Sequence, residues 1–148
     1  MKIMTVILGL IMLFTGCQST VTNTAVKADP NAPAEIRDVS VTDAQAAVSK
    51  AYSQFVDVRT VEEYAGGHAA RAINIPLDTL AAKVDTLEKN EPVYLICQTG
   101  SRSRKAADVL KTAGFKTIYN VTGGTVAWKE ASLPMENDAP HKVKSEAK

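Results

Sequence analysis

The sequence predicts an α/β fold in which a central parallel sheet of five strands is covered by helices on both faces. Short segments rich in apolar and β-branched residues alternate along the chain with segments whose apolar residues recur at helical spacing. The connections between them are short, and parallel strands need a crossover that is usually a helix. With 148 residues, the chain has room for one such domain once a targeting segment is set aside.

The expected strands are short apolar runs bounded by polar residues, glycine or proline. Pro76 closes the third strand and Pro92 introduces the fourth, as expected for a residue that cannot donate to a central ladder. The strands cover residues 36–41, 55–59, 72–75, 93–97 and 117–121.

The expected helices begin at capping signals. Thr42 with Gln45, and Thr60 with Glu63, have the spacing of a capping box, in which two side chains bind the first free amides of the helix. Gly114 is the expected stop of the helix after the fourth strand. The helices cover residues 42–50, 60–65, 77–87, 102–113 and 125–131.

The segment from Val93 to Ser103 predicts a nucleophile. A buried strand ends at Cys97, a turn containing Gly100 follows, and a helix begins at Arg102. Amides of a tight loop and the positive end of a helix favour an anion, and the nearest candidate is the Cys97 thiolate. We therefore expect the pKa of Cys97 to fall to roughly 5–7.

Two charged residues are expected near this cysteine. Asp57 and Arg59 end the second strand, and the carboxyl ends of parallel strands meet at one edge of the sheet, where sites gather. They could face a substrate or brace the loop; the alternative is an exposed pair that stabilises the next helix. His68 is expected to be structural, and its isolation from other ligands predicts no metal site.

Residues 1–16 have the features of a lipoprotein signal peptide. Lys2 supplies a positive start, and the apolar run to Phe14 is too short to span a bilayer. Leu13 to Cys17 resembles the lipobox of bacterial lipoproteins, whose cysteine is diacylated. We therefore expect an exported protein that is anchored by Cys17, and that is periplasmic or at the outer membrane in a Gram-negative host. An ordinary cleaved signal with an incidental cysteine is the alternative.

The rest of the chain divides into three parts. Residues 17–35 are expected to be a flexible tether, 36–135 the folded domain, and 136–148 a disordered tail. Removal of Lys2 with the signal leaves 16 basic and 16 acidic side chains, so no nucleic-acid partner is indicated. With Cys17 lipidated, Cys97 has no disulfide partner in the chain.

Residues 35–135 resemble the rhodanese-like sulfurtransferases at several places. Cys97-x-x-Gly100-x-Arg102 resembles their active-site loop, and Asp57-x-Arg59 their motif after the second strand. The run Asn74-Ile75-Pro76-Leu77, the pair Gly123-Gly124 and Trp128 also fit. Arg71 departs from the pattern, because it stands where the family usually has glycine.

The resemblance implies a domain that moves sulfur through a cysteine persulfide. Cys97 would attack the sulfane sulfur of a donor such as thiosulfate or a polysulfide, and a thiol or cyanide would then accept it. A monomer without metal or cofactor is expected, with a membrane contact through the lipid only. The implied catalytic residues are Cys97 and Arg102, and the implied substrate-binding residues are Gln98, Thr99, Gly100, Ser101, Ser103, Asp57 and Arg59.

Other readings stay open. A tethered module could carry a persulfide or bind a partner without turnover, and Cys97 could be an inert buried thiol. Phosphatases and arsenate reductases use a similar loop with five residues between cysteine and arginine, whereas four separate Cys97 from Arg102. The shorter loop favours a sulfur atom over a tetrahedral oxyanion. A thioredoxin-like site lacks its second nearby cysteine.

Overall fold

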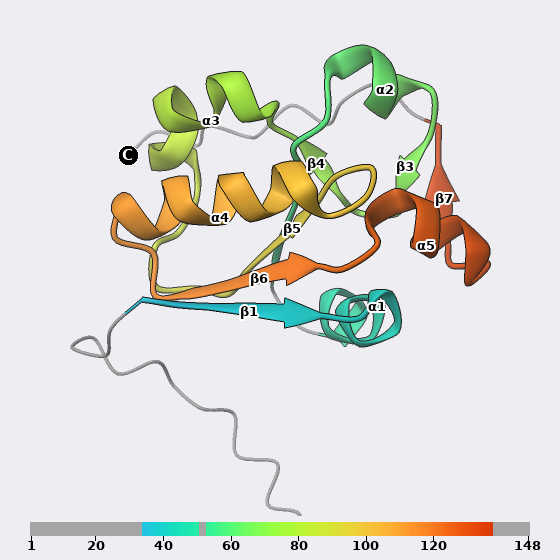
Figure 1. The fold of residues 1–148 in the computed structure, drawn as a ribbon, viewed down its shortest axis with the longest axis horizontal. Helices are drawn as coiled ribbons and strands as arrows, with labels where there is room; N and C mark the ends of the chain where they lie inside the picture. Colours follow the sequence, from blue (N-terminus) through green and yellow to red (C-terminus); the bar gives the residue numbers. More distant parts are fainter. Residues whose placement is uncertain (1–33, 51–52, 138–148) are drawn as a thin grey trace, which may run out of the picture.

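The computed structural model describes residues 34–50 and 53–137, which form a parallel sheet with helices on both faces (Figure 1). The predicted fold class is confirmed. All neighbouring strands of the sheet run parallel, in the order β1-β6-β5-β2-β4. These strands are β1 (Glu35–Val39), β2 (Gln54–Asp57), β4 (Ile73–Asn74), β5 (Val93–Ile96) and β6 (Thr117–Val121).

The two faces of the sheet bury separate apolar clusters, because neighbouring residues of a strand point to opposite sides. Leu95 packs with Leu110 on one face, and Ile96 packs with Trp128 on the other. The helices are α1 (Val41–Lys50), α2 (Val61–Ala65), α3 (Leu77–Lys83), which continues as a 3-10 turn (Val84–Thr86), α4 (Ser101–Thr112) and α5 (Gly124–Glu130). Helices α3 and α4 therefore cover the first face, while α1 and α5 cover the second.

The start of α1 differs from the expected capping box at Thr42. The helix begins at Val41, and the Ser40 hydroxyl accepts a hydrogen bond from the Asp43 amide at 3.1 Å. Ser40 is therefore the N-cap residue of α1, a role that was predicted for Thr42. The second expected box is confirmed: Thr60 and Glu63 cap α2 reciprocally, with bonds of 3.1 and 3.3 Å.

A small antiparallel sheet was not predicted. Strands β3 (His68–Ala69) and β7 (Met135–Glu136) pair at one end of the domain, as Figure 1 shows. Two residues are too few to leave an alternating pattern in the sequence. The carbonyl of Pro134 accepts bonds from the Ala70 amide at 3.0 Å and the Trp128 indole at 2.9 Å. Glu136, assigned to the polar tail, thus belongs to the folded part.

Several predictions fall outside the described residues: the signal peptide 1–16, Cys17 with its lipid, the tether up to residue 33, and the tail from residue 138. Glu35, assigned to the tether, lies in β1. In the part of the chain that the structure describes, no helix is both long and apolar enough to cross a membrane.

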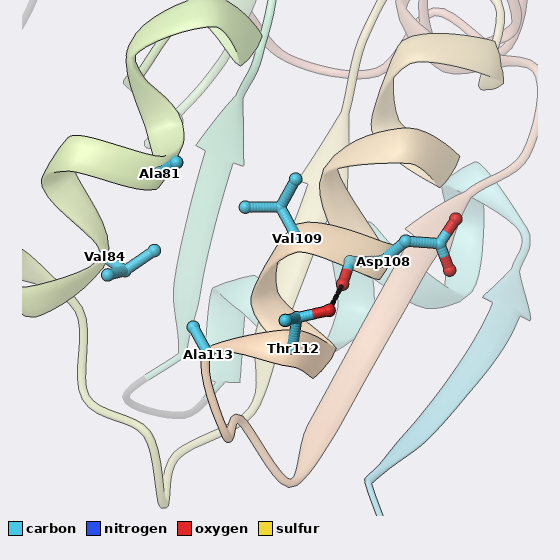
Figure 2. Close-up of a pocket in the computed structure, with 6 residues that line it drawn as sticks. All are labelled: Ala81, Val84, Asp108, Val109, Thr112 and Ala113. Atoms are coloured by element: carbon cyan, nitrogen blue, oxygen red, sulfur yellow. Dashed lines mark hydrogen bonds between the residues drawn. The ribbon is translucent and has the colours of Figure 1, made fainter.

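A groove of about 440 Å³ lies between α3 and the second half of α4 (Figure 2). Ala81 and Val84 line it from one side, and Val109 and Ala113 from the other; Asp108 and Thr112 complete it. The Cys97 loop lies at the opposite end of α4, about 10 Å away along seven residues of helix. The groove is therefore separate from the predicted nucleophile.

Candidate active site at the carboxyl end of β5

The loop after β5 wraps the sulfur of Cys97 in backbone amides. β5 ends at Ile96, and α4 begins at Ser101, one residue earlier than expected. Gly100 lies between them with a φ of 102°, a left-handed conformation that glycine adopts without strain. This turn directs the Gly100 amide at Cys97 Sγ, with an N–S distance of 3.1 Å.

The start of α5 fixes the other side of the loop. The Thr125 amide donates to the Cys97 carbonyl at 2.7 Å, and the Val126 amide donates to the Gln98 carbonyl at 3.1 Å. Gly124 permits this approach, because a Cβ there would lie 2.3 Å from the Cys97 carbonyl oxygen. The Gly123-Gly124 pair, noted above as fitting the family pattern, thus lets the start of α5 bind the loop backbone directly.

The thiol of Cys97 is 1% exposed, and its pKa is lowered. Burial acts in the opposite direction and raises the pKa. The Ser103 hydroxyl, together with the backbone amides of Ser103, Thr99 and Gly100, outweighs burial by hydrogen bonding to the thiolate. The direction agrees with the sequence prediction, and the cause is the cradle of loop donors.

Behind the sulfur, Ser103 and Asn120 meet in the interior. The Ser103 hydroxyl lies 3.5 Å from Cys97 Sγ and 2.7 Å from Asn120 Oδ1. Asn120 comes from β6, and its amide nitrogen donates to Asp38 at 2.8 Å. Asn120 was not predicted as a site residue; the available signal was an amide side chain between Tyr119 and Val121, near the carboxyl end of a predicted strand.

Arg102 does not act as a single charge beside the thiol. It forms a two-point ion pair with Glu63, with N–O distances of 2.6 and 2.7 Å. The hydrogen bond from Arg102 holds the pKa of Glu63 at about 2, and Glu63 in turn raises the pKa of Arg102. Glu63 was predicted only as a helix cap, so its second role was missed.

Asp57 and Arg59 form a buried brace. Their side chains are 0% and 6% exposed, and the Arg59 guanidinium contacts both carboxylate oxygens of Asp57 at 2.6 to 3.0 Å. It also donates to the Gly67 carbonyl at 2.9 Å, while the Asn74 amide binds the carbonyls of Asp57 and Arg59. The alternative of an exposed pair is wrong, since both side chains are held inside by these bonds.

Two clefts flank the loop, and the exposed Gln98, Thr99 and Ser101 lie at its surface. A polar cleft of about 350 Å³ is lined by Asp38, Thr99, Gly100, Arg104, Asn120 and Thr122. A larger cleft of about 670 Å³ is lined by apolar Val58, Val61, Pro76 and Leu77, polar Thr60 and Thr79, and charged Glu62, Asp78 and Arg102.

His68 and Arg71 shape the loop between α2 and β4. The buried His68 ring stacks on Tyr64 at a centroid distance of 3.6 Å, and its Nδ1 lies 3.0 Å from the Tyr64 carbonyl. This placement agrees with the expected structural role. Arg71 has a φ of 70°, so it keeps the left-handed conformation for which glycine is favoured. Arg71, at the position where the family usually has glycine, thus adopts a backbone region that favours glycine.

Comparison with known proteins identifies the relatives of this chain. The rhodanese-like domain matches residues 40–131. The chain is 36% identical over 118 residues to thiosulfate sulfurtransferase 18 of Arabidopsis thaliana, covering 70% of this chain and 86% of that protein. It is 38% identical over 73 residues, 49% of its length, to the putative sulfur carrier protein YrkF of Bacillus subtilis.

A solved structure shares the fold. A rhodanese-related protein from Thermoplasma volcanium superposes with a TM-score of 0.62 at 29% identity, covering 69% of this chain and 99% of that chain. The chain spans 40% of the length of YrkF and 60% of a second Bacillus subtilis relative, YqhL, to which it is 42% identical over 76 residues. Together, the family match, these relatives and the shared fold show that this chain belongs to the rhodanese-like domain family.

Proposed function

We propose that the protein is a sulfurtransferase that moves a sulfane sulfur from a donor such as thiosulfate or a polysulfide to a thiol or cyanide. The observation that carries the proposal is the buried Cys97 thiol with a lowered pKa, held by the Gly100 amide and the Ser103 hydroxyl. A thiolate is the reactive form of cysteine, and these donors favour it. The relative named thiosulfate sulfurtransferase 18 supports the same chemistry.

The reaction would proceed in two displacement steps. The Cys97 thiolate attacks the outer sulfur of thiosulfate, a sulfur–sulfur bond forms, and sulfite leaves with the electron pair of the broken bond. Cyanide or a thiolate then attacks the outer sulfur of the persulfide, and the Cys97 thiolate leaves. Charge and electrons balance in both steps, and no external oxidant or reductant is needed. This is ping-pong covalent catalysis.

The loop donors would serve both steps. The amides of Thr99, Gly100 and Ser103 act on the thiolate of the resting protein, and the same donors would stabilise negative charge on the persulfide. Gln98 and Ser101, exposed beside them, would contact the donor at the entrance. Asp57 and Arg59 would hold the end of β2 against the segment at Gly67 rather than touch the substrate, because their polar side-chain atoms bind each other and the backbone.

A persulfide carrier without turnover is the second candidate, favoured by the relative named a putative sulfur carrier protein. It uses the same first step and differs in the second. Steady-state turnover with thiosulfate and cyanide separates the two: repeated thiocyanate release supports the transferase, whereas release of one equivalent supports the carrier.

Mass spectrometry tests the shared step. Incubation with thiosulfate or a polysulfide should add one sulfur, about 32 Da, to Cys97, as a ping-pong nucleophile requires. Cys97→Ser should gain no mass and transfer no sulfur, and an aryl phosphate should be hydrolysed only at background rate. A Cys97→Ser variant with full turnover, or efficient phosphate hydrolysis, would overturn the proposal.

We also propose that the mature protein begins at a lipid-modified Cys17. The apolar run after Lys2 and the lipobox-like residues before the cysteine support this. The lipid would anchor the exported domain to a bacterial cell membrane, with a periplasmic or outer-membrane location in a Gram-negative host. Intact mass and detergent partitioning test it, with Cys17→Ser as control; an unlipidated wild-type product that is cut elsewhere would contradict it.

A further inference from the structure

The hydroxyl of Ser103 has one proton and three neighbouring acceptors. Asn120 Oδ1 lies at 2.7 Å, the Gly100 carbonyl at 3.0 Å and Cys97 Sγ at 3.5 Å. The side chain is fully buried, so water does not compete with these acceptors for the Ser103 proton. The three acceptors therefore compete for one hydrogen, and Asn120 offers the shortest bond.

Asp38 fixes which end of the Asn120 amide faces Ser103. A carboxylate can only accept hydrogen bonds, so the Asn120 nitrogen must face Asp38, at 2.8 Å. The amide oxygen is then turned toward Ser103. Arg104 also donates to Asp38, at 3.1 Å, on the exposed side of this contact.

From these contacts we infer that Asn120 is a positioning residue, which holds the Ser103 proton away from Cys97 Sγ until negative charge develops on the sulfur. A neutral or sulfur-bonded Sγ is a weak acceptor, so the hydroxyl stays with Asn120. A thiolate is a charged acceptor and draws the hydroxyl to itself. The change of acceptor from Asn120 Oδ1 to Cys97 Sγ needs only rotation of the Ser103 hydroxyl.

The consequence for catalysis rests on the proposed function. In the persulfide, Sγ is bonded to the outer sulfur and carries little charge; in the second step it leaves as a thiolate. The bond from Ser103 would therefore strengthen as the reaction proceeds. An interaction that is stronger in the transition state than in the ground state accelerates the step.

The titration of Cys97 tests the inference without any sulfur transfer. The rate of alkylation by iodoacetamide is measured against pH, and its midpoint gives the thiol pKa. Ser103→Ala keeps the backbone amide and should raise the midpoint. Asn120→Leu removes the competing acceptor at similar volume and should lower it, by about half to one pH unit. Opposite signs are the diagnostic result, because damage to the loop would raise the midpoint in both.

The double variant separates the hydrogen bond from other effects. With Ser103→Ala already present, Asn120→Leu should no longer shift the midpoint. The charged groups near the hydrogen bonds between Cys97, Ser103 and Asn120 are Asp38 on β1, Arg104 and Arg102 on α4, and Glu63 on α2. A through-space effect of any of these charges on the pKa of Cys97 would persist in the Ser103→Ala background.

Asp38→Ala provides a surface variant in case Asn120→Leu fails to fold. It frees the Asn120 amide to turn its nitrogen toward Ser103, and should lower the midpoint less than Asn120→Leu does. Glu35→Ala, on the same strand, is the matched control. A midpoint raised by Asn120→Leu, a shift by Asn120→Leu that survives Ser103→Ala, or a shift by Asp38→Ala that is as large with Ser103→Ala as without it, would overturn the inference. If the midpoints shift as expected but the native protein transfers no sulfur, the inference about Asn120 stands and the proposed function is rejected.

Discussion

Arg102 and Glu63 form an ion pair beside the Cys97 loop although 39 positions separate them in the chain. The pair links the first turn of α4 to the first turn of α2, where Glu63 also caps the helix. One carboxylate oxygen of Glu63 serves both the Arg102 guanidinium and the Thr60 amide. The charge of Arg102 is thus largely balanced before it acts on the thiol.

Loss of Arg102 alone should raise the thiol pKa. Arg102→Ala leaves the Glu63 carboxylate without its cation near Cys97, and a nearby negative charge disfavours a thiolate. The double variant with Glu63→Gln should return the midpoint close to that of the native protein. The alkylation pH profile measures both. Equal midpoints for Arg102→Ala and the native protein would contradict the argument.

The pair should also make stability depend on pH. The pKa of Glu63 is about 2 in the folded protein, below its ordinary value of 4.5, so the carboxylate stabilises the fold fully above pH 4.5. That contribution is lost as pH falls toward 2. Glu63→Gln should lower the free energy of unfolding by about 1 kcal/mol at pH 7, since the pair is a third exposed, and by much less near pH 2. Denaturant unfolding at several pH values, with the exposed Glu91→Gln as control, checks this.

Removal of Arg59 should damage the fold more than any exposed charge would. Arg59→Ala leaves the buried Asp57 carboxylate without its guanidinium partner, with only the backbone amide of residue 59 still bound, and leaves the Gly67 carbonyl without its donor. Breaking one side of a buried pair costs about 3 kcal/mol or more. Thermal unfolding should show a large loss for Arg59→Ala and a small one for Arg37→Ala, whose pair with Glu35 is exposed. Similar losses for the two would show that Asp57 is not held inside.

Arg71→Gly should stabilise the protein. Arg71 has a φ of 70°, where a residue with a Cβ is strained by roughly 1 kcal/mol and glycine is not. Arg71→Ala keeps the strain and loses the side-chain bond to the Ser49 carbonyl, so it should not stabilise. Chemical denaturation compares the two. A Gly variant less stable than the Ala variant would show that the conformation is not strained.

Gly124→Ala should disrupt sulfur transfer, whereas Gly114→Ala should not. Both glycines have a positive φ, 58° and 93°, so backbone strain accompanies both substitutions and is not smaller at Gly114. A Cβ at Gly124 would meet the Cys97 carbonyl at 2.3 Å, while nothing lies within 4 Å of one at Gly114. Displacing the loop by about 1 Å can cost on the order of 100-fold in rate. Persulfide formation, followed by mass, reads out the difference; equal rates would show that α5 does not brace the loop.

The acidic side chains of the larger cleft should weaken the use of anionic donors. Glu62 and Asp78 line this cleft with Arg102, whose charge is balanced by Glu63. Glu62→Gln and Asp78→Asn should each raise kcat/KM for thiosulfate about twofold at low salt, and the gain should shrink at high salt. Asp85→Asn, which removes an acid paired with Lys89, is the control. An unchanged rate would place the donor outside this cleft.

Local signals predicted the elements that depend on neighbouring residues. The capping box at Thr60, the stop at Gly114 and the β5 strand leading into Cys97 each need only a few consecutive residues. The parallel sheet followed from their alternation. Ser40 was not predicted as the N-cap because Thr42 and Gln45 have the spacing of a capping box. Which residue caps α1 depends on where the chain leaves β1.

The contacts that tune the site were not predictable, because they join distant parts of the chain. Asn120 meets Asp38 across 82 positions, and Arg102 meets Glu63 across 39. Only the order of strands in the sheet brings these side chains together, and no pattern in the sequence gave that order. The same holds for the burial of Asp57 and Arg59, which requires Gly67 and Asn74 to lie beside them.

The small β3–β7 sheet sets how far the folding unit extends. The family match ends at residue 131, yet Pro134 accepts bonds from Ala70 and Trp128, and Glu136 pairs with His68. A chain that stopped at residue 131 would leave the buried indole nitrogen of Trp128 without this acceptor. Residues 134 to 136 thus tie α5 to β3 across one end of the domain, and a chain cut at residue 131 would lose these bonds.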